Sequence, residues 1–106
     1  MTKAQIVDRV ADATGLTKIE TEAVIDGFLF TVMEAVKDGE MVEIRGFGTL
    51  RPRERAQRSA RNPRTDEPVE VPRRYVPVFK PALEFRDGVN AARMAAESGN
   101  EVRGGE

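Results

Sequence analysis

The segment 51–64 carries the side chains in this sequence with the most evident chemical role. It reads RPRERAQRSARNPR and holds six arginines against one acidic residue, Glu54. Guanidinium groups at this density repel one another unless a polyanion lies beside them. Arg51, Arg53 and Arg55 alternate along the chain, so on a β-strand their side chains share one face. The segment therefore predicts a positively charged arm that binds a polyanion.

The charge distribution separates this arm from the rest of the protein. The 106 residues have a formal net charge of −1, but residues 51–80 hold nine basic and four acidic side chains, whereas residues 1–50 hold five and nine. A polyanion responds to the local potential more than to the net charge. Two other interpretations stay open: a solvated basic strand that discourages aggregation at a sheet edge, or an arm that binds an acidic protein.

Composition argues against several classes of function. The sequence has no cysteine and no histidine, which removes disulfides, most zinc sites and most nucleophile–base pairs. No group of carboxylates points to catalysis, so we expect no enzyme, cofactor, metal ion or small-molecule substrate. The N-terminal residues lack the apolar run of a signal peptide, and no segment approaches membrane-spanning length. We therefore expect a cytoplasmic protein without membrane contact.

Two capping boxes predict an N-terminal helical hairpin. Thr2 with Gln5, and Thr17 with Glu20, have the spacing at which a hydroxyl and a longer polar side chain cap the first turn reciprocally. Gly15 ends the first helix, and the second continues to about residue 37, before Gly39. The second helix is apolar over a wide arc, and about 90 ordered residues give one copy few side chains to bury. We therefore expect two copies to share one core.

Residues 41–50 predict a β-hairpin. Residues 41–45 alternate, with Val42 and Ile44 on one side. Gly46-Phe47-Gly48 forms the turn, with Phe47 anchored in the core, and the chain re-enters a strand at Thr49.

Prolines define the next segment, because all six lie between positions 52 and 81. Proline cannot donate to a strand ladder, so the segments that contain Pro52 and Pro72 must lie at a sheet edge or in a free two-stranded ribbon. Turn-forming residues place the tip of this ribbon near 62–67. Pro63 at the tip could be a turn former only, or an apolar wedge that unstacks base pairs and kinks a duplex.

The C-terminal part predicts one more helix and a tail. Pro81 can open a helix over about 82–94, with Leu83, Phe85 and Val89 facing inward. The glycine-rich end has the composition of a disordered segment. We place the domain boundary after residue 94, which leaves 95–106 as a disordered tail of no assigned function.

Three motifs together resemble the HU/IHF family of bacterial DNA-bending proteins. They are VEIRGFGTL at 42–50, the arginine-rich segment ending in RNPRT at 51–65, and YVPVFKP at 75–81. The resemblance covers about residues 1–92, and EIRGFG and RRYVPVFKP are closer to the beta subunit of integration host factor than to a typical HU. It implies an α+β fold: a helical-hairpin base, a three-stranded antiparallel sheet with a long β-ribbon arm at about 52–74, a short C-terminal helix, and an intertwined dimer.

The resemblance also implies a function and its residues. The chain would be an architectural protein of the bacterial nucleoid that binds double-stranded DNA, prefers bent or distorted duplex, and bends and compacts DNA through the minor groove. It would act as a homodimer or a heterodimer. Lys3, Arg45 and Lys80 would be body contacts, Pro63 would intercalate, and Arg74 would accompany Arg73 on the returning strand. The implied DNA-binding residues are Lys3, Arg45, Arg53, Arg55, Arg58, Arg61, Asn62, Pro63, Arg64, Arg73 and Lys80.

The sequence departs from the family pattern at two places. The tip usually reads Thr-Gly-Glu, but here Asp66 follows Thr65. Aspartate adopts positive φ less readily than glycine, so we expect a stiffer or differently shaped tip with an added charge that phosphate repels. Ala82-Leu83 replaces the usual Gly-Lys, which removes one basic contact. The alternatives are a sequence-specific subunit that needs a different partner chain, and a protein-interaction module for an acidic partner.

Overall fold

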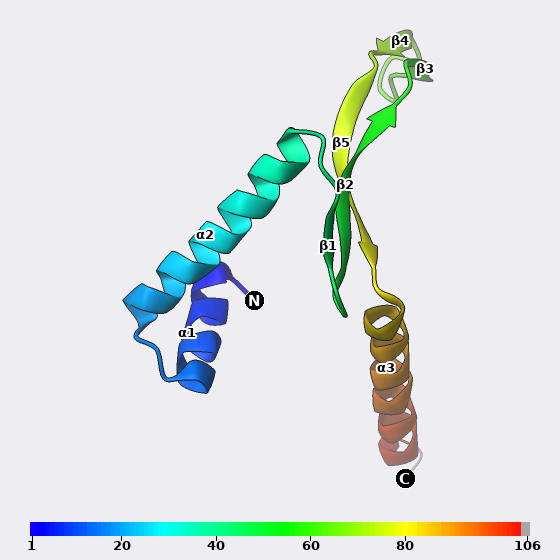
Figure 1. Ribbon diagram of the computed structural model, residues 1–106. Coiled ribbons are helices and arrows are strands. Elements are labelled where there is room, and N and C mark those ends of the chain that lie inside the picture. The colour runs from blue at the N-terminus through cyan, green and yellow to red at the C-terminus, as the bar shows by residue number, and fades with distance from the viewer. Residues whose placement is uncertain (105–106) are drawn as a thin grey trace.

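The computed structural model describes residues 1–104 of the chain, and it has the predicted α+β class (Figure 1). Residues 105–106, the end of the predicted tail, lie outside the described residues. In chain order the elements are α1 (Lys3–Thr14), α2 (Lys18–Lys37), β1 (Val42–Ile44), β2 (Gly48–Arg55), β3 (Arg58–Arg61), β4 (Pro68–Val71), β5 (Arg74–Pro81) and α3 (Leu83–Gly104).

The helical hairpin forms from α1 and α2, as predicted. The Thr2 hydroxyl accepts a hydrogen bond from the Gln5 amide at 3.3 Å, and Gln5 Oε1 accepts one from the Thr2 amide at 2.8 Å. Thr17 and Glu20 form the same pair, and these hydrogen bonds lower the pKa of Glu20 below its ordinary value. Gly15 ends α1 with φ of 79°, a left-handed conformation in which glycine has no steric penalty. Both capping predictions are confirmed.

The three-stranded sheet has the order β1-β2-β5 with antiparallel pairing throughout. In β1, Val42 and Ile44 are half-buried and Glu43 is exposed, as the alternation predicted. The Phe47 amide donates to the Ile44 carbonyl at 3.0 Å and closes the turn. At Gly48 a Cβ atom would meet the Lys80 carbonyl oxygen at 2.5 Å, so the close approach of two strands requires glycine there.

The arm is a continuation of β2 and β5 beyond the end of β1 (Figure 1). The last residue of β2 that pairs with β1 is Leu50, so from Arg51 onward β2 has one neighbour only. Proline at position 52 therefore costs no hydrogen bond of the ladder, although it has no N–H to donate. The distal pair β3–β4 keeps the same register, and the ladder is interrupted near Pro72, which also has no N–H to donate. The prediction of a two-stranded ribbon is confirmed.

The C-terminal helix is longer than the sequence predicted. We expected a short helix over 82–94 and a disordered tail from 95, but α3 continues to Gly104. The run AARMAAE at 91–97 consists of strong helix formers, whose summed propensity outweighs the glycines that follow. The predicted end of the helix near residue 94 was therefore too early, because it rested on the composition of the final residues alone.

One copy of the chain buries little apolar surface. Val7 and Ala11 are the buried apolar side chains among those described, and Thr21 is buried beside them. Phe47, Phe79 and Phe85 contact one another where α3 meets the sheet, with ring centroids 4.9 Å apart for the first two. The radius of gyration is 20.3 Å, whereas a compact chain of this length has about 13 Å. The elements therefore hold an open shape (Figure 1).

Candidate functional site

The strand register divides the side chains of the arm into two faces. Arg51, Arg53 and Arg55 alternate along β2 with Leu50, Pro52 and Glu54, so the two sets point in opposite directions. Cross-strand partners share a face, and β5 contributes two further cations in this way, because Arg74 pairs with Arg55 and Lys80 pairs with Thr49. We call the resulting surface the basic face. Its cations are Arg51, Arg53, Arg55, Arg74 and Lys80, and Glu43, Val76 and Val78 share the same side.

The other face of the sheet is apolar and lies toward α2. Leu50 and Pro52 line a hollow together with Val32, Met33 and Val36 of α2. Because α2 covers this side, the basic face points away from the helices. The side chains on the basic face form no ion pair among the described residues, so their charge is available to a ligand.

Arg73 does not belong to the basic face. Its Nη1 lies 3.2 Å from Glu54 Oε1, and its guanidinium carbon lies 5.6 Å from the centre of the Tyr75 ring. Glu54 and Tyr75 are cross-strand partners on the face opposite Arg55 and Arg74. The structure thus separates Arg73 from the other predicted contacts and gives it a carboxylate partner.

The distal ribbon also divides its arginines. Arg58 and Arg61 are three residues apart on β3, so they lie on opposite faces of this two-stranded segment. Glu70 pairs with Ser59 and shares a face with Arg61, and Gln57 Nε2 donates to Glu70 Oε2 at 2.6 Å. The distal ribbon is therefore less uniformly basic than the arm nearer the body.

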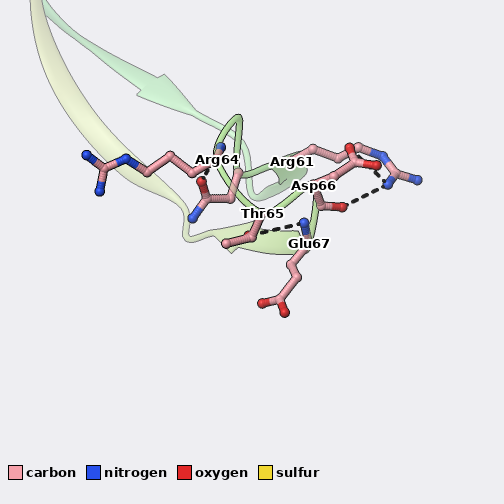
Figure 2. Close-up of polar contacts among 6 residues, drawn as sticks. Arg61, Arg64, Thr65, Asp66 and Glu67 are labelled. Atoms are coloured by element: carbon pink, nitrogen blue, oxygen red, sulfur yellow. Dashed lines mark hydrogen bonds and ion pairs between the residues drawn. The ribbon is translucent and has the colours of Figure 1, made fainter.

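The tip is a four-residue loop that begins at Pro63 and ends at Asp66 (Figure 2). The Asn62 amide donates to the Glu67 carbonyl at 2.9 Å, and the Asp66 amide donates to the Asn62 carbonyl at 2.7 Å. Asn62 Oδ1 accepts a hydrogen bond from the Arg64 amide at 2.9 Å. The predicted turn at 62–67 is confirmed, and Asp66 adopts φ of 58°, the positive value that the family's glycine would accommodate.

The predicted body contacts lie in two places. Arg45 and Lys80 line one shallow hollow beside the β1–β2 turn, where Glu43 and Glu84 are also present. Lys3 lies on α1, away from the arm in Figure 1. Its Nζ donates to Asp26 Oδ1 at 2.9 Å, and this hydrogen bond together with the Asp26 charge raises the pKa of Lys3. One copy does not bring Lys3 together with the arginines of the arm.

Arg51 was missing from the predicted set of contacts, and Arg74 was named only as a companion of Arg73 on the returning strand. Arg51 and Arg74 carry the same orientation as Arg53 and Arg55. The parity of Arg51 with Arg53 is visible in the sequence, so this residue could have been included. Arg74 could be assigned only after the register of β5 against β2 was known.

The described part of the chain has neither a cluster of possible metal ligands nor a helix that could span a membrane. No group of three or more acidic side chains there lies close enough together to hold a metal ion. No helix within residues 1–104 has both the length and the apolar character needed to cross a membrane.

Comparison with known sequences identifies close relatives. Residues 1–90 match the family model described as bacterial DNA-binding protein. DNA-binding protein HU of Clostridium pasteurianum is 44% identical over 90 residues, which cover 85% of this chain and 99% of that protein. The SPbeta prophage-derived DNA-binding protein HU 2 of Bacillus subtilis is 42% identical over 91 residues, which cover 86% and 99%.

Solved structures show the same fold. A cocrystal structure of Anabaena HU with DNA matches with a TM-score of 0.80 at 42% identity, covering 84% of this chain and 97% of that chain. HU from Thermotoga maritima matches with a TM-score of 0.59 at 31% identity, covering 84% and 98%. These relatives are HU proteins, and the predicted closeness to the beta subunit of integration host factor stays a prediction.

Proposed function

This chain belongs to the family of bacterial DNA-binding proteins, and we propose that it is an architectural protein that binds and bends double-stranded DNA. The observation that supports this best is the basic face, where five cations line one side of the sheet and arm and form no ion pair with any residue that the structure describes. Arginine and lysine that neutralise phosphates release counterions from the duplex, which drives binding without regard to sequence.

The arm carries the second part of the proposal. Its length and its pairing in one register would let it follow a groove, with Pro63 at the far end as the wedge between base pairs. Unstacking a step costs a few kcal/mol, and bending a short site costs about 1–6 kcal/mol. Several neutralised phosphates per arm can offset both terms. DNA that is already bent or nicked should therefore bind more tightly than intact duplex.

The assignment of individual contacts follows from the two faces. Arg53, Arg55 and Lys80 would contact phosphates, joined by Arg51 and Arg74. Arg61, Asn62, Pro63 and Arg64 would act at the tip. Arg45 would contribute beside Lys80, and Arg58 would act from the face of the distal ribbon opposite Arg61. Lys3 and Arg73 would contribute less, because Lys3 lies on α1 with Asp26 and Arg73 lies off the basic face with Glu54.

We further propose that the active form is a homodimer with two arms. Phe28, Phe30 and Met33 on α2 are each more than half exposed in one copy, and a second copy with the same apolar surface would cover them. A dimer also doubles the number of cations that face one duplex. Such a protein would reside in the cytoplasm, in the bacterial nucleoid, where its DNA ligand is found.

A salt series of binding measurements tests this proposal. The purified protein would be titrated onto a plain duplex and onto a nicked duplex of equal length and sequence. We expect tighter binding to the nicked duplex. We also expect the logarithm of the binding constant to fall linearly with the logarithm of the salt concentration, with a slope of about −0.9 for each neutralised phosphate. Equal affinity for the two duplexes would refute bending as the source of binding preference. No binding at low salt would favour a protein partner, and binding to selected sites alone would favour a sequence-specific subunit.

A further inference from the structure

The arm tip contains an internal contact between Arg61, the last residue of β3, and Asp66, the last residue of the loop (Figure 2). Arg61 Nη1 donates to the Asp66 backbone carbonyl at 3.1 Å and lies 3.5 Å from Asp66 Oδ1. One guanidinium nitrogen thus serves a carbonyl and a carboxylate of the same residue. The contact closes the loop that presents Pro63.

The conformation of Asp66 makes this contact possible. Its φ of 58° is in the left-handed region, where aspartate and asparagine are tolerated better than most other residues. This backbone conformation turns both the carbonyl and the carboxylate of Asp66 toward Arg61. A glycine at this position would keep the backbone shape and the carbonyl but would supply no negative charge.

The contact changes the electrostatics of the tip. Residues 61–67 carry two arginines and two acidic side chains, so the formal charge of the tip is zero. The basic face nearer the body carries five cations with no ion pair among the described residues. The end of the arm that would enter the groove is therefore neutral, whereas its base is strongly positive.

We propose that the Asp66 carboxylate is a built-in competitor of DNA phosphate for Arg61, and that it sets how firmly the arm tip holds DNA; this inference rests on the proposed function. The pair is exposed, so phosphate can displace the carboxylate, but Asp66 then remains beside the duplex as an uncompensated negative charge. Asp66 acts on affinity through Arg61 and is a positioning residue rather than a DNA contact. It lowers the affinity of the tip for DNA and leaves binding by the basic face unchanged.

The test compares two variants that remove the charge and keep the backbone. Asp66→Asn retains a residue that tolerates positive φ, and Asp66→Gly removes the side chain altogether. Each full-length variant would be titrated onto the same nicked duplex over a range of salt concentrations. We expect affinity at low salt to rise about three- to tenfold, and the log–log salt slope to steepen by up to about 0.9 per arm as Arg61 gains a phosphate.

Glu67→Gln is the matched control. Glu67 is the adjacent acidic residue, and its carboxylate points away from both labelled arginines (Figure 2). Its substitution removes the same charge from the tip without freeing an arginine, so its affinity and its salt slope should stay closer to those of the unmodified protein. Equal gains for Glu67→Gln and Asp66→Asn would overturn the specific role of Asp66. Unchanged affinity in both Asp66 variants would overturn the inference and leave the proposed function standing, whereas no binding by any of the proteins would reject the proposed function itself.

Discussion

Arg73 and Arg74 are neighbours in the sequence but lie on opposite sides of the arm. Arg74 pairs across the strands with Arg55 on the basic face, whereas Arg73 is held between Glu54 and the Tyr75 ring. A guanidinium that already has a carboxylate partner gains less from a phosphate, because the first interaction must be given up or shared.

This difference predicts unequal effects of two matched substitutions. Arg74→Ala should weaken DNA binding and reduce the log–log salt slope by about 0.9 per arm, since one phosphate contact is lost. Arg73→Ala should change both quantities less, because Glu54 already neutralises this arginine. Fluorescence anisotropy with one labelled duplex over a salt series measures both. Equal losses for the two variants would show that the ion pair with Glu54 opens in the complex.

The arm as an element is a hairpin with Pro63, the proposed wedge, at its far end. Its strands keep one register from Gly48 to Arg61, so the position of Pro63 relative to the sheet follows from the strand pairing. The interruption near Pro72 is the one place along β2–β5 and β3–β4 where the ladder loses bonds. There no ladder pair joins the two strands of the arm.

At this scale we predict that Pro63→Ala lowers DNA bending more than DNA binding. The phosphate contacts along the arm remain, but the smaller side chain unstacks a base step less effectively. Energy transfer between dyes at the two ends of a duplex reports the bend angle. Pro68→Ala is the control, because Pro68 pairs with Arg61 within the ribbon rather than at its tip. Identical bend angles for Pro63→Ala and the unmodified protein would exclude the wedge.

At the scale of the whole molecule, a single copy leaves large apolar side chains exposed. Among the described residues, the side chain of Phe28 is 51% exposed and that of Phe30 is 62% exposed. Helix α3 projects from the sheet without packing on α1 or α2 (Figure 1). Exposed apolar area of this kind stabilises a protein only when another surface removes it from water. A second copy would supply that surface and a second arm.

We therefore predict a dimer whose stability depends on concentration. Sedimentation equilibrium at micromolar concentration should give twice the mass of one chain, and the unfolding midpoint should rise with protein concentration. Phe28→Glu should dissociate the dimer and abolish cooperative unfolding, because it places a charge in the shared core. Val69→Glu, a substitution at a similarly exposed apolar side chain on the arm, should leave the dimer intact. A monomer with unfolding independent of concentration would contradict the shared core.

The sequence by itself determined the features whose hydrogen bonds join residues a few positions apart. The two capping boxes, the stop at Gly15, the turn around Phe47 and the tip at 62–67 all fall where residue types and spacing placed them. The prolines located the ribbon for the same local reason, since each removes a donor at a known position. The extension of α3 from residue 95 to residue 104 was not predicted, although helix propensity is also local, because the glycines near the C-terminus were given too much weight.

Only the tertiary structure decided which cations share a face and which ones meet a carboxylate. Arg74 joins the basic face because β5 pairs with β2 in one register, and Lys3 meets Asp26 because α1 packs on α2. Arg73 meets Glu54 for the same kind of reason, since 19 positions separate them along the chain and the strand pairing brings them to 3.2 Å. Charge pairing depends on distance in space, and residue spacing alone does not fix that distance.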